Sequence, residues 1–238
     1  MLRRRLLPLV LVLPLAACGS AADSRPVTPP SASATPRDAL VASVSGIRAG
    51  NYAFDLKNSN GAGLTGSMHL PSGSAQWWSS GGNFSSQVRV VGRDRFTRST
   101  IALGGSAPAD DGAGWSRVDA GTPAGPGEFY DLADPDWVGV GPLLEAANSA
   151  EVVGPTIRGT VDLTKVRNSN KIVGMGKLHG LAPNTGTAAP YVATLDAKGR
   201  LAKLELDVPA MVPIPPAEKW TFEFSDYGSA RPARSPLR

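Results

Sequence analysis

The stretch PYVATLDAKGRLAKLELDVP, residues 190–209, contains two runs of alternating apolar and polar residues separated by a short turn. The apolar positions recur at every second residue: Tyr191, Ala193 and Leu195 before the turn, then Leu204, Leu206 and Val208 after it. The segment between them, DAKG at 196–199, has the Asp and Gly that tight turns favour. Successive side chains of a strand point to opposite faces, so this pattern predicts a β-hairpin with one packed and one wet face.

The same period of two extends along most of the chain and predicts further strands. It is found within residues 52–57, 64–70, 87–90, 157–163 and 220–225, and Trp115 and Val118 sit in a further short run. The adjacent pair Trp77-Trp78 is expected to place one indole on each face of a strand.

Helical spacing occurs twice. Thr35 is a candidate N-cap with Pro36 at the first helical position, and apolar residues follow as far as Gly50, which predicts a helix of about three turns. A second helix is predicted at about 136–149, with Pro142 inside its pattern. The order of elements predicts an α+β fold: about five strands, a helix and about four more strands, in one open antiparallel sheet with helices on one face.

The N-terminus carries signals for export and anchoring. Residues 1–5 are cationic, residues 6–17 are apolar, and LAAC at 15–18 ends in Cys18, the only cysteine of the sequence. This order is typical of a secretory signal peptide. LAAC also resembles the bacterial lipobox, in which the chain is cut before the cysteine and the thiol is joined to diacylglycerol. We therefore expect a lipoprotein signal peptide over 1–17, lipid attachment at Cys18 and an exported protein anchored to the outer face of the cell membrane; the alternative is a plain signal peptide.

Composition restricts the rest of the chain. Residues 18–36 are rich in Ser, Ala and Pro, which predicts a disordered tether, and the basic residues 229–238 are expected to form a flexible tail. Removal of 1–17 lowers Lys plus Arg from 24 to 21, against 20 Asp plus Glu. With a formal charge of about +1 and no basic patch, nucleic acid is not expected as a partner.

Few side chains suggest chemistry. His69 and His179 have no partners at ligand spacing, and the single thiol is assigned to lipid, so we expect no catalytic residue, metal or cofactor. Asp131, Asp134 and Asp136 form an acidic group that we interpret as helix caps, because Asp accepts hydrogen bonds from the free N–H groups of a helix start.

Several segments together resemble the LppX/LprG-type lipoproteins of actinobacteria, which share the LolA-like fold. The matching segments are NYAFDLKNS (51–59), VRVVGRDRFTRS (88–99), GWSRVD (114–119), DLADPDWVGVGPLLEAANSAEVVG (131–154), TIRGTVDLTKV (156–166), PYVATLDAKGRLAKLELDVP (190–209) and KWTFEFSDYGSARP (219–232). The resemblance implies a LolA-like domain over 37–228, in which a curved open antiparallel sheet, or half-barrel, wraps around a few helices. It also implies that acyl chains of a lipid or lipoglycan bind between sheet and helices, for lipid transport or retention in the cell envelope.

Residues on the predicted inner face would line such a cavity; without a cavity, they would form an ordinary core. They are Tyr52, Phe54, Leu56, Met68, Leu70, Val88, Val90, Leu143 and Leu144. The alternative hypothesis keeps the fold and makes the protein a non-catalytic envelope sensor or structural protein that contacts a protein partner. An exported hydrolase that uses one of the histidines is the weakest reading.

Overall fold

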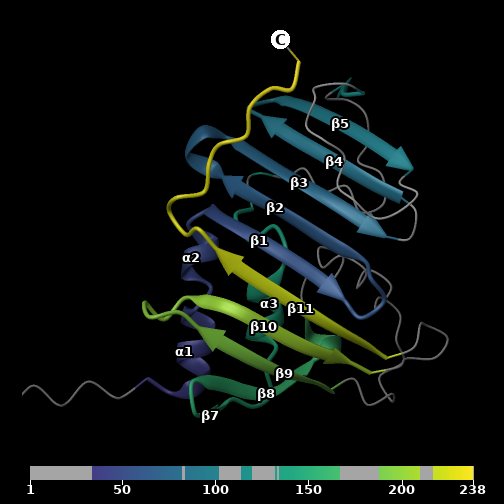
Figure 1. Cartoon of the computed structure of the whole chain (residues 1–238). Coiled ribbons are helices and arrows are strands. Elements are labelled where there is room, and N and C mark those ends of the chain that lie inside the picture. The colour runs from purple at the N-terminus through teal and green to yellow at the C-terminus, as the bar shows by residue number, and fades with distance from the viewer. Residues whose placement is uncertain are drawn as a thin grey trace, which may run out of the picture. The chain divides into compact units, whose positions relative to one another are not determined.

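A computed structural model describes residues 34–81, 84–101, 114–119, 132, 134–166, 188–209 and 217–237. The strands are β1 Asn51–Asn58, β2 Gly63–His69, β3 Ser74–Gly81, β4 Phe84–Val91, β5 Asp94–Ile101, β6 Ser116–Val118, β7 Glu151–Val153, β8 Thr156–Asp162, β9 Ala188–Leu195, β10 Leu201–Val208 and β11 Glu218–Ser225. They form one 11-stranded antiparallel sheet in the order β6-β5-β4-β3-β2-β1-β11-β10-β9-β8-β7 (Figure 1). The predicted open antiparallel sheet with few helices is confirmed.

The middle of the sheet joins the two ends of the domain. β1 pairs with β2 on one side and with β11 on the other, with Phe54 opposite Phe224. The predicted hairpin is also present, because β9 and β10 flank a turn in which Asp196 Oδ1 accepts hydrogen bonds from the N–H groups of Lys198 and Arg200, both at 2.9 Å. Local turn chemistry therefore sets the register of this pair.

The first predicted helix is divided into two. α1 spans Pro36–Ala42 and begins with a capping box between Thr35 and Asp38, and α2 spans Ser45–Arg48. The prediction of a single helix of about three turns was therefore wrong. Its cause is Ser43, at the break between α1 and α2, whose carbonyl oxygen accepts a hydrogen bond from the N–H of Leu201 at 2.9 Å. Tertiary pairing with β10 thus replaces helix continuation.

The second predicted helix is shorter than its apolar pattern. α3 spans Val140–Glu145, where residues 136–149 were expected. The chain leaves the helix because the N–H of Asn148 donates to the carbonyl oxygen of Thr160 at 2.8 Å, which ties this segment to β8. Two 3₁₀ turns, η1 Leu70–Ser72 and η2 Leu163–Lys165, follow β2 and β8.

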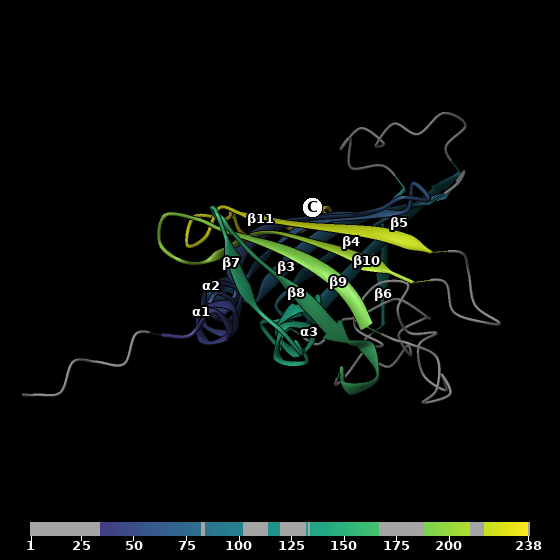
Figure 2. The same ribbon diagram turned by 90° about the horizontal axis from the view of Figure 1, so that it is seen from below.

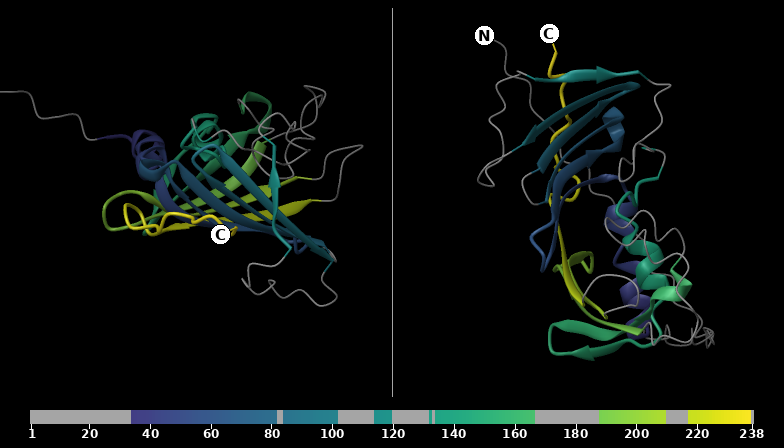
Figure 3. Two further views of the ribbon diagram at one scale, coloured as in Figure 1. Left: turned by 90° about the horizontal axis from the view of Figure 1, so that it is seen from above. Right: turned by 90° about the vertical axis from the view of Figure 1, so that its right-hand side faces the viewer.

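The three helices lie on one face of the sheet, called here the inner face, and the opposite face is called the outer face (Figures 2 and 3). Alternation along the strands sends most of the large apolar side chains inward; Phe96, opposite Arg89, is an exception on the outer face. Trp77 is buried on the inner face, whereas Trp78 is half-buried on the outer face, as the adjacent pair predicts. The largest fully buried side chains are Tyr52, Leu56, Met68, Leu143, Leu144, Leu204, Leu206 and Phe222, together with Leu40, Ile47 and Leu201.

The C-terminal segment makes contacts with the sheet. We expected residues 229–238 to be a flexible tail, but the described part, 229–237, runs along the outer face (Figures 1 and 3). Ala230 and Ala233 are buried, and the N–H of Ala233 donates to the hydroxyl of Ser74 at 3.1 Å. The small side chains permit this close approach.

Several predicted features fall outside the described residues. They are the signal peptide 1–17, Cys18, residues 18–33 of the tether, Asp131 and His179. Among the residues that are described, no helix has both the length and the apolar character needed to cross a membrane.

Candidate functional site

The predicted cavity residues meet between the sheet and the helices, where they are packed together. Eight of the nine are buried, and only Leu70, in η1, is partly exposed at the edge of the core. Tyr52, Leu56, Leu143 and Leu144 are 0 % exposed. A side chain with no exposed surface borders no space that water enters, so in this structure these residues form core.

An aromatic side chain that the predicted cavity set did not include fills the centre of the inner face. Trp137 is buried, and its ring centroid lies 4.6 Å from that of Trp77 and 5.6 Å from that of Phe54. Gly66 lies between these two residues in the sheet register, where a Cβ would meet Phe54 Cζ and Trp77 Cβ, each at 2.7 Å. The absence of a side chain at Gly66 therefore leaves room for the aromatic rings. The signal in the sequence was the aromatic residue of DPDW (134–137), at the start of the second predicted helix.

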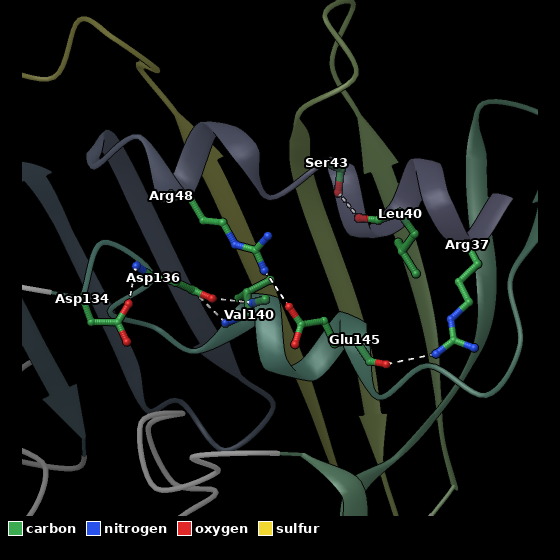
Figure 4. A network of polar contacts seen from close by, with 9 residues as sticks. Arg37, Leu40, Ser43, Arg48, Asp134, Asp136, Val140 and Glu145 are labelled. Atoms are coloured by element: carbon green, nitrogen blue, oxygen red, sulfur yellow. Dashed lines mark hydrogen bonds and ion pairs between the residues drawn. The ribbon is translucent and has the colours of Figure 1, made fainter. Parts of the chain in front are cut away.

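A buried carboxylate holds the segment that carries Trp137. Asp136 accepts hydrogen bonds from the N–H groups of Val140 at 3.0 Å and Gly141 at 2.5 Å (Figure 4). Burial raises the pKa of the Asp136 carboxyl, and the two backbone N–H groups act in the opposite direction. Asp134 in turn accepts from the N–H of Asp136 at 3.0 Å. The interpretation as a helix cap is therefore confirmed for Asp136, which accepts from the first two N–H groups of α3 although Gly139 is the N-cap residue; Asp134 instead accepts from the turn before the helix.

Further contacts join this segment to the first helices and to the sheet. Arg48 of α2 forms an ion pair with Glu145 of α3 at 2.6 Å, and Arg37 of α1 donates to the carbonyl oxygen of Glu145 at 3.2 Å (Figure 4). Tyr52 donates its hydroxyl hydrogen to the carbonyl oxygen of Pro135 at 3.0 Å. Because the Arg48–Glu145 pair is about half exposed, it contributes only about 0–1 kcal/mol.

The outer face has a hollow of its own. A space of about 380 Å³ lies over β2, β3 and β4. Register places six of its lining side chains on the outer face: Thr65, Ser67, Gln76, Trp78, Gln87 and Arg89. Trp115, directly before β6, is the seventh, and its ring lies against Arg89. A second space of about 490 Å³ shares Thr65 and Gly66 with the first and extends over β1, β11 and β10. Sequence analysis did not predict this site, although the alternation that sends Trp77 inward also sends Trp78 outward.

The described residues include no group of His, Cys, Asp and Glu side chains that could hold a metal ion. His69 has a local role, since its Nδ1 accepts a hydrogen bond from the N–H of Ser72 at 3.2 Å and lies 2.7 Å from the Ser72 hydroxyl. This imidazole therefore caps η1. Neither a scan of protein-family models nor a search of curated proteins gives a match for the chain.

Proposed function

We propose that this protein is an exported, non-catalytic envelope lipoprotein, anchored through Cys18, that binds a lipid or another amphiphile between the sheet and the helices of a LolA-like half-barrel. The lipobox supports the anchor, and the resemblance of seven segments to the LppX/LprG-type lipoproteins supports the lipid cargo. The observation that carries the proposal is the sparse cover that the described residues give to the inner face. Within those residues, three helices of seven, four and six residues, with the Trp137 segment, lie against an 11-stranded sheet.

Binding at this interface requires the helix side to move, because the core is closed. The Trp137 side chain is the natural part to be displaced, since it belongs to a loop rather than to a helix or strand. An acyl chain that replaced it would gain about 25 cal/mol per Å² of apolar surface removed from water. The exposed Arg48–Glu145 pair is a weak link between α2 and α3, so its separation costs little.

The side chains at this interface are suited to hold a ligand by packing alone, without a catalytic reaction. Its described lining is aliphatic and aromatic, and Asp136 is engaged with backbone N–H groups. An amphiphile would therefore be selected by shape and apolar area, with its polar head outside the core.

A protein-contact function is the second candidate, and one observation favours it. Val152 and Val153, in the edge strand β7, are 59 % and 40 % exposed. An edge strand with exposed apolar side chains is suited to pair with a strand of another protein. In this reading, the filled core serves only stability.

The test is mass spectrometry of organic extracts from the exported chain carrying Cys18→Ser, which cannot be acylated at that position, purified without detergent from an actinobacterial host. We expect one lipid class at near-stoichiometric amount, absent from an unrelated exported protein. Trp137→Phe should retain the lipid. The matched control is Trp220→Phe, on the same face in β11, which should also retain it. A folded protein whose extracts contain no recurring lipid would contradict the proposal and favour the protein-contact function.

A further inference from the structure

The hollow over β2, β3 and β4 is built from two parallel rows of outer-face side chains. Register aligns Thr65, Trp78 and Gln87 in one row, and Ser67, Gln76 and Arg89 in the next. The rows are two residues apart along each strand, which is about 7 Å. All the strands below are paired on both sides, so the hollow presents side chains rather than free backbone groups.

The lining chemistry is polar and aromatic. Hydroxyl, amide and guanidinium groups surround the indole rings of Trp78 and Trp115, and none of the six outer-face lining side chains is aliphatic. In the part of the chain that the structure describes, neither indole N–H has an acceptor. A buried donor without an acceptor costs free energy, and a ligand oxygen would recover that free energy at Trp78 once this indole turned toward the hollow.

The indole ring of Trp115 is held in place at one side of the hollow. The guanidinium groups of Arg89 and Arg98 lie 4.8 Å and 5.2 Å from the ring centroid of Trp115, on which they make cation–π contacts. Arg98 is itself buried, and it donates to the side-chain oxygen of Gln87 at 2.9 Å. A wall fixed in this way loses little conformational entropy when a ligand binds.

We propose that this outer-face hollow is a binding site for a linear saccharide. The apolar C–H faces of a sugar ring pack on indole faces, while its hydroxyl groups match amides and hydroxyls, which both donate and accept. The second space, which continues from Thr65 toward Lys203 and Glu223, provides room for further sugar units. This site is separate from the proposed lipid interface, which lies on the other face of the sheet.

Other ligand classes fit the hollow less well. An acyl chain would leave the amides and hydroxyls without partners, which is unfavourable in a desolvated site. A peptide strand usually binds to a free sheet edge through its backbone, but the strands below this hollow are interior to the sheet. The combination of indoles with hydroxyl, amide and guanidinium groups therefore favours a saccharide.

The experiment is isothermal titration calorimetry of the Cys18→Ser chain with maltohexaose, chitohexaose and oligogalacturonate, combined with tryptophan fluorescence. We expect at least one of the three to bind, and Trp78→Ala to weaken that binding by about tenfold or more, because it removes a stacking surface. Gln76→Ala, a milder change in the same hollow, should weaken binding by about threefold. Thr221→Ala, on the outer face of β11, lines neither space; it is the control and should bind as the parent chain does.

Three results would overturn the proposal. The first is that none of the three saccharides binds at a concentration of about 10 mM, which is above the dissociation constant of most specific sites. The second is unchanged affinity in both Trp78→Ala and Gln76→Ala. The third is binding of oligogalacturonate alone that is abolished at about 0.3 M NaCl, since this would indicate only non-specific charge attraction.

Discussion

The two faces of the same strands differ in what they bury. At β1, β2 and β3 the inner face has Phe54, Gly66 and Trp77 around Trp137, closely packed, whereas the outer face has Thr65 and Trp78 beside a hollow. One alternating sequence therefore produces a closed apolar layer and a polar hollow, back to back. Substitutions on the inner face should therefore act on stability, and substitutions on the outer face on binding.

Gly66→Ala should have the largest effect on this comparison. Its Cβ would lie 2.3 Å from the carbonyl oxygen of Gln76, and both Phe54 and Trp77 would also have to shift. We expect a loss of about 3 kcal/mol or more in the free energy of unfolding, measured by chemical denaturation. Ser67→Ala, the neighbouring position on the outer face, should change it by less than about 0.5 kcal/mol. Similar values for both variants would contradict the distinction between the faces.

The tryptophans allow a matched pair of truncations. Trp137→Ala should lower the free energy of unfolding by about 3 kcal/mol, because it leaves a cavity against Trp77. Trp78→Ala should lower it by about 1 kcal/mol or less, since this side chain is half-buried beside the hollow. Denaturation curves of the two variants and the parent chain measure the difference. An equal loss would mean that the outer face is as closely packed as the inner one.

Asp136→Ala should have an intermediate effect. It removes the acceptor of the Val140 and Gly141 N–H groups, which leaves two helix donors unpaired, and we expect a loss of about 1–2 kcal/mol. Because the cap positions Trp137, the near-UV circular dichroism of the aromatic residues should change as well. A variant with parental stability would show that the cap does not hold the segment.

Acidification should change the contributions of two aspartates to stability in opposite directions, because their pKa values are shifted in opposite directions. Hydrogen bonds from Arg200 lower the pKa of Asp196 in the outer turn, so its contribution to stability is present above the unfolded pKa and is lost as pH falls through the folded pKa. Burial raises the pKa of Asp136, so stability is lost as pH rises from the unfolded pKa through the folded one. Stability measured across about pH 2–6 should therefore fall less steeply on acidification in Asp196→Asn and more steeply in Asp136→Asn. Parallel curves for the two variants would refute these signs.

Much of the fold was predictable because its signals are local. Alternation indicated most of the strands, although not β5 or β7; the DAKG turn indicated the β9–β10 hairpin, and Thr35 with Pro36 indicated the start of α1. The helix lengths were not predictable, because Ser43 and Asn148 pair with strands that are distant in the sequence. Spacing along the chain contains no information about that competition.

The candidate sites were predicted less completely. The inner-face residues were identified correctly as one group by their common phase, but the sequence did not show that Trp137 would close the space between them. The outer hollow depends on the register of β2, β3 and β4, and on Trp115 from beyond β5, which the alternation of single strands does not define. Both sites therefore needed the tertiary structure.

The most direct test of the account locates the lipid on one of the two faces. A phospholipid with a diazirine in one acyl chain would be equilibrated with the Cys18→Ser protein, photoactivated and mapped by peptide mass spectrometry. The account predicts labels in the Trp137 segment and on inner-face residues such as Leu144. Labels confined to the outer face around Trp78, or no labelling of a folded protein, would contradict it.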